Sequence, residues 1–132
     1  MLYLTGVNDK ILLTCSGAAT TGILACWEDE DPNSGQRPVG GRTLMSLSST
    51  DATAIVPANI GKNNFRRIRS ISIKPTVGMT VHISASDGTT TIEIFSADLE
   101  AGDHLMYEER RGWYVVLASG IPATQDQFTD AA

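Results

Sequence analysis

MTVHISASDGTTTIEIF, residues 79–95, is the stretch that decides the fold of this chain. Val81, Ile83 and Ala85 alternate with polar residues, and a period of two is typical of a strand with one buried side and one solvent-facing side. The dipeptide Asp87-Gly88 comes next, and a flanked Asp-Gly pair is a strong signal for a type I′ hairpin turn, because both central residues need a positive φ. Apolar residues then alternate again up to Phe95. The stretch therefore predicts two antiparallel strands joined by a two-residue turn.

Turn signals divide the rest of the chain into short extended segments. We expect strands at residues 104–108 and 113–117, and upstream at residues 10–15, 22–28, 43–49, 53–58 and 65–75. Residues 10–15 and 22–28 should pair as a hairpin, and Leu44 and Met45 should be buried. Ile68 is out of phase with the isoleucines that follow it, which predicts either a β-bulge near Ile68-Arg69 or a strand buried on both faces. Residues 99–103 should form a turn in which Gly102 takes the difficult backbone position, and residues 110–112 a tight connection.

These segments add up to eight or nine short strands at roughly ten-residue intervals, with no convincing helix. The pattern is typical of a β-sandwich or barrel. We expect an all-β, single-domain antiparallel β-sandwich, with the jelly roll as one specific form. The domain should cover residues 1–120, and residues 121–132 should form a flexible C-terminal tail.

Length and charge exclude several classes of protein. The 132 residues (14.1 kDa) suit one domain that buries roughly two-thirds of its unfolded surface. A net charge of −5 and a pI near 4.8 argue against direct binding of nucleic acid, because phosphate neutralisation needs a basic field. No apolar run approaches the ~20 residues of a membrane-spanning helix, and the first residues lack the basic start and apolar core of a signal peptide. We therefore expect a soluble protein made in a cytoplasm, with no membrane partner.

The two cysteines, Cys15 and Cys26, are too few for a disulfide framework or a four-ligand zinc site. Both lie in apolar segments, which favours buried free thiols that act as small hydrophobes. The alternative is a disulfide between the two arms of the expected hairpin, which a reducing cytoplasm disfavours.

Two groups of charged residues are candidates for a protein interface. Glu28, Asp29, Glu30 and Asp31 lie in a segment, residues 28–41, whose composition predicts a loop. Their spacing does not match a calcium-binding loop, so we interpret them as a solvated acidic loop that can also present charge to a partner. Arg66, Arg67 and Arg69 lie on the expected strand 65–75. They would bind a polyanion or carboxylate, protect an edge strand from aggregation, or pair with the acidic loop of another protomer.

A search for catalytic residues finds no constellation. His82 and His104 are the only histidines, and no nucleophile elbow, phosphate loop or dinucleotide fingerprint is present. Glu108 and Glu109 are sequence neighbours, so on a strand they should point to opposite faces and cannot act as a pair. We expect no enzymatic activity, no cofactor, no metal and no small-molecule substrate.

Several motifs resemble a group of small structural proteins of tailed bacteriophages. They are the run from Val81 through Asp87-Gly88-Thr89, the strand end at Phe95, the Leu99-x-Ala101-Gly102-x-x-Leu105-x-Tyr107-Glu108 segment, and Arg111-Gly112-Trp113-x-Val115. Asn8-Asp9-Lys10-Ile11 and Val56-Pro57-Ala58 are similar to the same group, so the resemblance spans most of residues 8–120. It implies a virion component without catalysis, most similar to a capsid decoration (cement) protein. Such a protein would be a homotrimer that binds the major capsid protein on the capsid exterior after assembly in the host cytoplasm.

Two other functions compete with the decoration protein. A head–tail connector or tail component has the same size and fold, and would form a ring rather than a trimer. A carbohydrate-binding module needs aromatic side chains exposed on one face. The candidates for that role are Tyr3, Trp27, Phe65, Tyr107, Trp113 and Tyr114.

Overall fold

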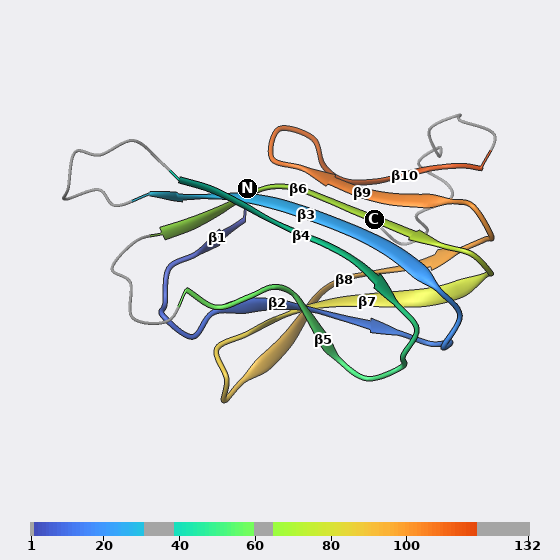
Figure 1. Ribbon diagram of the computed structural model, residues 1–132, viewed down its shortest axis with the longest axis horizontal. Coiled ribbons are helices and arrows are strands. Elements are labelled where there is room, and N and C mark those ends of the chain that lie inside the picture. The colour runs from blue at the N-terminus through green and yellow to red at the C-terminus, as the bar shows by residue number, and fades with distance from the viewer. Residues whose placement is uncertain (1, 31–38, 60–64, 119–132) are drawn as a thin grey trace.

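The computed structural model describes residues 2–30, 39–59 and 65–118, which form ten β-strands and no helix. The strands make two antiparallel sheets packed face to face, so the predicted all-β sandwich is confirmed (Figure 1). The strand count is one or two higher than expected, partly because the two-residue β1 carries no periodic signal. Within the described residues no helix is long and apolar enough to cross a membrane.

One sheet has six strands and the other has four. The six-stranded sheet has the order β10-β9-β6-β3-β4, and β1 also pairs with β6. Its strands are β1 (Tyr3–Leu4), β3 (Thr21–Glu30), β4 (Val39–Leu47), β6 (Phe65–Pro75), β9 (His104–Glu108) and β10 (Gly112–Val116). The four-stranded sheet has the order β5-β2-β7-β8. Its strands are β2 (Lys10–Cys15), β5 (Thr53–Val56), β7 (Met79–Ser86) and β8 (Thr91–Leu99).

The expected hairpin between residues 10–15 and 22–28 is wrong, because β2 and β3 belong to different sheets. β2 pairs with β7 from Lys10↔Ser86 to Cys15↔Val81, and β3 pairs with β6 from Thr21↔Pro75 to Glu30↔Phe65. The loop between β2 and β3 therefore crosses from one layer to the other. Both cysteines are free thiols: Cys15 is buried, as predicted, whereas Cys26 is only half-buried.

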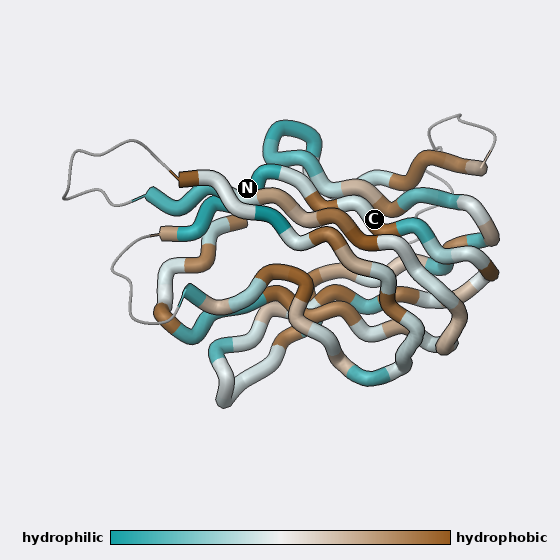
Figure 2. The backbone as a smooth tube through the Cα atoms, viewed as in Figure 1, coloured by the Kyte–Doolittle hydropathy of each residue, from teal (hydrophilic) through white to brown (hydrophobic). Residues whose placement is uncertain are grey.

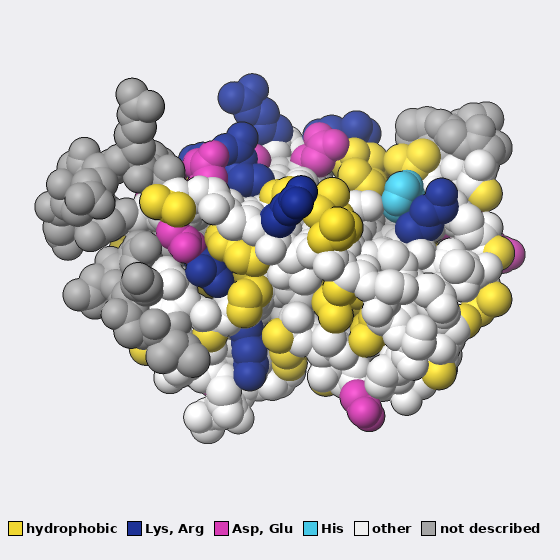
Figure 3. Space-filling model, viewed as in Figure 1, with side chains coloured by type: hydrophobic (Ala, Val, Ile, Leu, Met, Phe, Trp, Pro, Cys, Tyr) yellow, Lys and Arg dark blue, Asp and Glu magenta, His cyan; other side chains and the backbone are white. Residues whose placement is uncertain are grey.

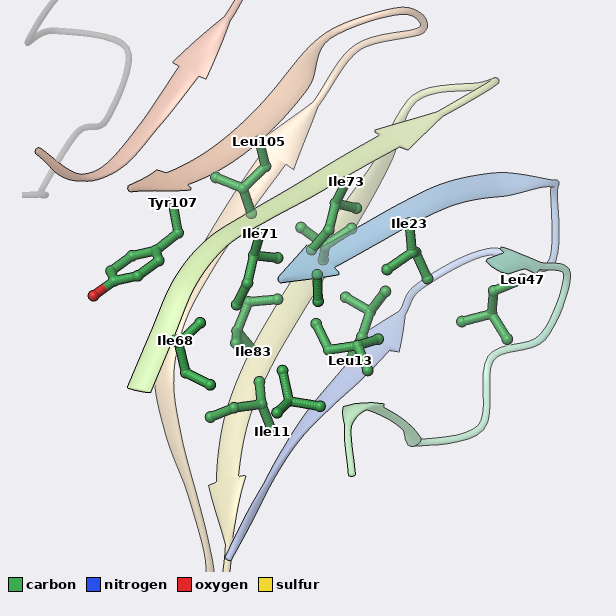
Figure 4. Close-up of a cluster of buried hydrophobic side chains, with 14 of the residues drawn as sticks. Ile11, Leu13, Ile23, Leu47, Ile68, Ile71, Ile73, Ile83, Leu105 and Tyr107 are labelled. Carbon is green, nitrogen blue, oxygen red and sulfur yellow. The ribbon is translucent and has the colours of Figure 1, made fainter. Parts of the chain in front are cut away.

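The core lies between the inner faces of the two sheets (Figure 4). Leu13 on β2 and Ile83 on β7 face Ile23 on β3 and Ile71 on β6, and all four are at most 2% exposed. The predicted bulge in β6 is confirmed: Cys26 pairs with Ser70 while Trp27 pairs with Ile68, which leaves Arg69 without a partner on β3. The extra residue shifts the alternation by one, so Ile68 and Ile71 both reach the core.

The turn between β7 and β8 lies one residue later than the sequence predicts. The backbone N–H of Asp87 donates to the carbonyl of Thr90 at 3.2 Å, so the two central residues are Gly88 and Thr89. Ser86 pairs with Thr91, and Gly88 has the positive φ of 93° that only glycine adopts easily. The Asp87 side chain accepts hydrogen bonds from the backbone N–H groups of Thr89 and Thr90, which lowers its pKa below the ordinary value. Gly102 (φ 84°) and Gly112 (φ 76°) take the positive φ expected in the other two turns.

Replacing Gly88 by valine is expected to lower the free energy of unfolding by about 1–3 kcal/mol, because a β-branched residue is strained at positive φ. Steric clash contributes little, since a Cβ at this position meets only Asn8 at 4.0 Å. The matched control is Gly17→Val, at a loop glycine without positive φ and with no atom within 4 Å of an added Cβ. Urea denaturation of the three proteins checks this, and equal stability of Gly88→Val and Gly17→Val would contradict it.

Candidate functional site

The two predicted groups of charged residues lie side by side on neighbouring strands. Glu28, Asp29 and Glu30 are the last residues of β3, and residues 39–41 begin β4, so the loop expected over residues 28–41 is wrong at both ends. Asp31 lies outside the described residues. The register sets Glu28 opposite Arg67 and Asp29 opposite Arg66. β6 pairs with β3 on one side and with β1 and β9 on the other, so the edge-strand interpretation of its arginines is wrong. Opposite charges placed across adjacent strands stabilise the pairing.

Arg66 is the buried member of this group, with 7% of its surface exposed. Its guanidinium donates two hydrogen bonds to the Asp29 carboxylate, at 2.7 and 3.0 Å, and a third to the carbonyl of Pro57 at 2.6 Å. Its Cζ also lies 4.8 Å from the centroid of the Trp27 ring. Gly41 lies close against the same indole: an added Cβ there would come within 2.5 Å of the indole nitrogen. Arg66 therefore holds together the end of β3, the segment after β5 and the core.

Arg67 and Arg69 share their carboxylate partners. Arg67 pairs with Glu28 at 2.9 Å, with Glu109 at 3.4 Å and with Glu30 at 3.5 Å. Arg69 pairs with Glu28 and, at 2.9 Å, with Glu109. Sequence reasoning missed Glu109, which comes from the β9–β10 turn and whose backbone N–H donates to the carbonyl of Arg69. In Figure 2 the hydrophilic colour gathers where the end of β3, the start of β6 and this turn meet.

We call these seven residues the charge cluster: Glu28, Asp29, Glu30, Arg66, Arg67, Arg69 and Glu109. Three guanidinium groups face four carboxylates, so the cluster is nearly neutral and its charges are paired within one chain. Two buried polar atoms without a hydrogen bond, Arg67 Nε and Glu109 Oε2, face one another at 3.4 Å. The structure shows that the arginines bind carboxylates of their own chain. The use of these residues as an interface with a partner stays a prediction.

The histidines and the remaining glutamates are dispersed. His82 Nδ1 lies 2.6 Å from Glu93 Oε1 on the four-stranded sheet. Burial, together with the nearby charge of Lys74, lowers the pKa of His104 below its ordinary value. Glu108 accepts a hydrogen bond from the Tyr114 hydroxyl at 2.6 Å, and this bond raises the pKa of Tyr114. Glu108 and Glu109 therefore contact different partners. The predicted opposite faces of one strand do not apply to them, because β9 ends at Glu108 and Glu109 lies in the turn that follows. Within residues 2–30, 39–59 and 65–118, no three His, Cys, Asp or Glu side chains are placed to hold a metal ion.

Most aromatic side chains are in or against the core rather than on a binding face. Trp27 and Tyr107 are buried, and Trp113 stacks on Phe95 at 5.1 Å between ring centroids. Tyr3 and Phe65 are the aromatic rings with large exposure among the described residues. The row of exposed rings that a carbohydrate-binding module needs is therefore not formed by the six candidates.

Sequence reasoning also missed a row of side chains on the outer face of the six-stranded sheet. Leu44 on β4 is opposite Leu24 on β3, Leu24 is opposite Ser72 on β6, Ser72 is opposite Met106 on β9, and Met106 is opposite Tyr114 on β10. We call these five residues the outer-face row. The expected burial of Leu44 is wrong, since it is 70% exposed, and Leu24 is 36% exposed. Met45 is partly buried against the core, as expected. The spacing in the sequence indicated this: Leu44 and Leu47 are three positions apart and point to opposite faces of a regular strand, so only one of them can be buried.

A shallow hollow of about 570 Å³ lies beside this row, lined by Cys26, Gly40, Arg42 and Arg69 among others. Gly40 and Gly41 have no side chains to fill it. Figure 3 shows hydrophobic side chains in the middle of this face, with Lys and Arg side chains around them. Comparison of the chain with models of protein families, with curated protein sequences and with solved structures found no match.

Proposed function

We propose that this protein is a non-enzymatic structural protein of a tailed-bacteriophage virion, which binds the capsid surface as a decoration (cement) protein. Two things support the proposal: the resemblance stated above, strongest over residues 99–115, and the outer-face row. The row is the observation that carries it. A sheet face that exposes adjacent apolar side chains is suited to bind another folded protein.

The charged residues alone suggest a partner contact through the arginines of the charge cluster, whereas the outer face offers a mainly apolar contact. The arginines of the charge cluster already bind carboxylates, so they have little charge left for a partner. Arg42 and Lys74 are exposed beside the outer-face row, and no carboxylate among the described residues pairs with them. A partner with apolar side chains framed by acidic ones would fit this face. Several copies on one shell would add their contacts, as expected of a trimer.

The test is cosedimentation of purified protein with capsid shells that lack it, prepared from the phage that carries its gene. We expect Leu24→Glu to weaken binding at least tenfold, because it places a charge in the middle of the apolar contact. Ile92→Glu is the matched control, at a 63% exposed side chain on the other sheet, and should bind like the wild type. Because the contact is mainly apolar, binding should persist in 0.5 M salt, where the screening length falls to about 4 Å.

Two outcomes would overturn the proposal. One is a chain that ignores shells at every salt concentration and forms rings with neck or tail proteins, which would make it a connector. The other is equal binding of Leu24→Glu and the wild type, which would remove the outer face from the contact.

A further inference from the structure

The free edge of β4 is the feature that goes furthest beyond the proposed function. β4 pairs with β3 at nine positions, from Asp29↔Val39 to Thr21↔Leu47. No strand of the described chain pairs with its other edge, and Figure 1 shows β4 along the margin of the six-stranded sheet. Backbone N–H and C=O groups along such an edge are available to another strand.

β4 also lacks the features that normally protect an edge. Arg42 is its only charged residue, it has no proline, and its pairing with β3 shows no bulge. β8, the equally long edge strand of the other sheet, carries Glu93 and Asp98 and has a bulge at Ile94. The remaining edge strands, β1, β5 and β10, have only two, four and five residues. β4 is therefore the one long edge in the described chain that is open to pairing.

We propose that β4 pairs antiparallel with β4 of a second copy, about a two-fold axis at Leu44. This register places Leu44 against Leu44 of the second copy, Arg42 against Ser46, and Thr43 against Met45. Residues that face each other then lie on the same side of both sheets, as antiparallel pairing requires. Seven residues of each copy, 41–47, take part.

The side chains of β4 select this register over its neighbours. An axis at Arg42 would set two guanidinium groups against each other, which is destabilising. An axis at Thr43 would set each Leu44 against an Arg42. Leu44 is the most exposed large hydrophobic side chain among the described residues. Only the axis at Leu44 packs it against Leu44 of the second copy. It also makes the outer-face row continuous from Tyr114 of one copy to Tyr114 of the other.

The two-fold axis runs perpendicular to the sheet, so both outer faces point the same way. The pair is a single twelve-stranded sheet with two adjacent copies of the proposed capsid-binding face. The contact does not depend on the capsid function. In a trimer, it would join one trimer to the next.

The first test measures the association of the purified protein by analytical ultracentrifugation. Leu44→Lys should raise the dissociation constant of the pair at least tenfold, because two ammonium groups would meet across the axis. Ile92→Lys, at a similarly exposed side chain on β8, should leave the dissociation constant unchanged. If the wild type is monomeric at high micromolar concentration, or if both variants associate like it, the pairing does not occur.

The second test checks the register by disulfide cross-linking, in a Cys26→Ser background that removes the half-exposed native thiol. Leu44→Cys should form dimers on mild oxidation, because directly opposed Cβ atoms lie about 4.5–5.5 Å apart. Arg42→Cys and Ser46→Cys should cross-link when mixed, but neither should cross-link alone. Cross-linking of Ser46→Cys alone, or of Ile92→Cys but not Leu44→Cys, would overturn the proposed contact. Leu44 also belongs to the outer-face row, so Leu44→Lys cannot separate this pairing from capsid binding. Leu24→Glu separates them, because Leu24 lies on β3 rather than on the free edge: it should weaken shell binding while leaving the dissociation constant of the pair unchanged.

Discussion

Replacing Arg66 by methionine is expected to lower the free energy of unfolding by about 3–5 kcal/mol, the usual cost of removing one partner from a buried ion pair. The loss has three parts in this structure. The Asp29 carboxylate, with 16% of its side chain exposed, would be left without its two charge-assisted hydrogen bonds. The carbonyl of Pro57 would lose its donor, and the Trp27 ring would lose the cation above it. Urea denaturation followed by tryptophan fluorescence measures the change.

Arg69→Met is the matched control, since its side chain belongs to the same cluster but is 43% exposed. Exposed ion pairs contribute about 0–1 kcal/mol, so this variant should be close to the wild type. A double variant, Arg66→Met with Asp29→Leu, should recover a large part of the loss, because it removes both buried charges. If Arg66→Met lowers the free energy of unfolding by less than about 1 kcal/mol, the Arg66–Asp29 pair is effectively solvated, and the charge cluster does not stabilise the fold.

The sequence predicts individual strands well because alternation records which side chains are buried. Val81 and Ile83 are fully buried, as their period of two indicated, and β6 and β9 begin and end as predicted. The bulge at Arg69 was also predictable, because a single extra residue reverses the phase of the apolar positions. These features depend only on residues close together in the chain.

The pairing of the strands could not be predicted in the same way. The segments containing Ile11 and Ile23 are both apolar and are joined by a short polar loop, and a hairpin and a crossover between layers share that pattern. Their actual neighbours are distant in the chain: paired residues are 66–76 positions apart between β2 and β7, and 35–54 positions apart between β3 and β6. The same limit explains the charge cluster: the sequence identified its acidic and basic members, but only the fold places Glu109 between Arg67 and Arg69. The same limit explains why the expected burial of Leu44 is wrong: an apolar side chain does not by itself show which face of β4 the rest of the fold covers.

Trp113→Ala is expected to cost about 3–5 kcal/mol, the range for removing a large aromatic side chain from a core. Trp113 follows the Gly112 turn at the start of β10, in the six-stranded sheet, and its side chain is partly buried against the core. Its ring lies parallel to that of Phe95 on β8, with 9° between the planes, and 5.0 Å from the ring of Tyr107 on β9. Because Phe95 belongs to the four-stranded sheet, the Trp113 ring joins the two layers at their β8–β10 side.

Removing this ring would open a cavity between the layers and expose Phe95 and Tyr107. Tyr107 matters beyond its ring, since its hydroxyl accepts a hydrogen bond from the backbone N–H of Leu2 at 2.8 Å. Trp113→Ala should therefore also loosen the N-terminal strand, which faster hydrogen exchange at Ile68, whose N–H donates to the carbonyl of Leu2, would report. Tyr114→Ala is the control, because Tyr114 is the next residue on β10 and belongs to the opposite, outer face; we expect it to cost much less. A loss below about 1 kcal/mol for Trp113→Ala would show that the ring is a surface aromatic, available to a partner rather than used to hold the two sheets together.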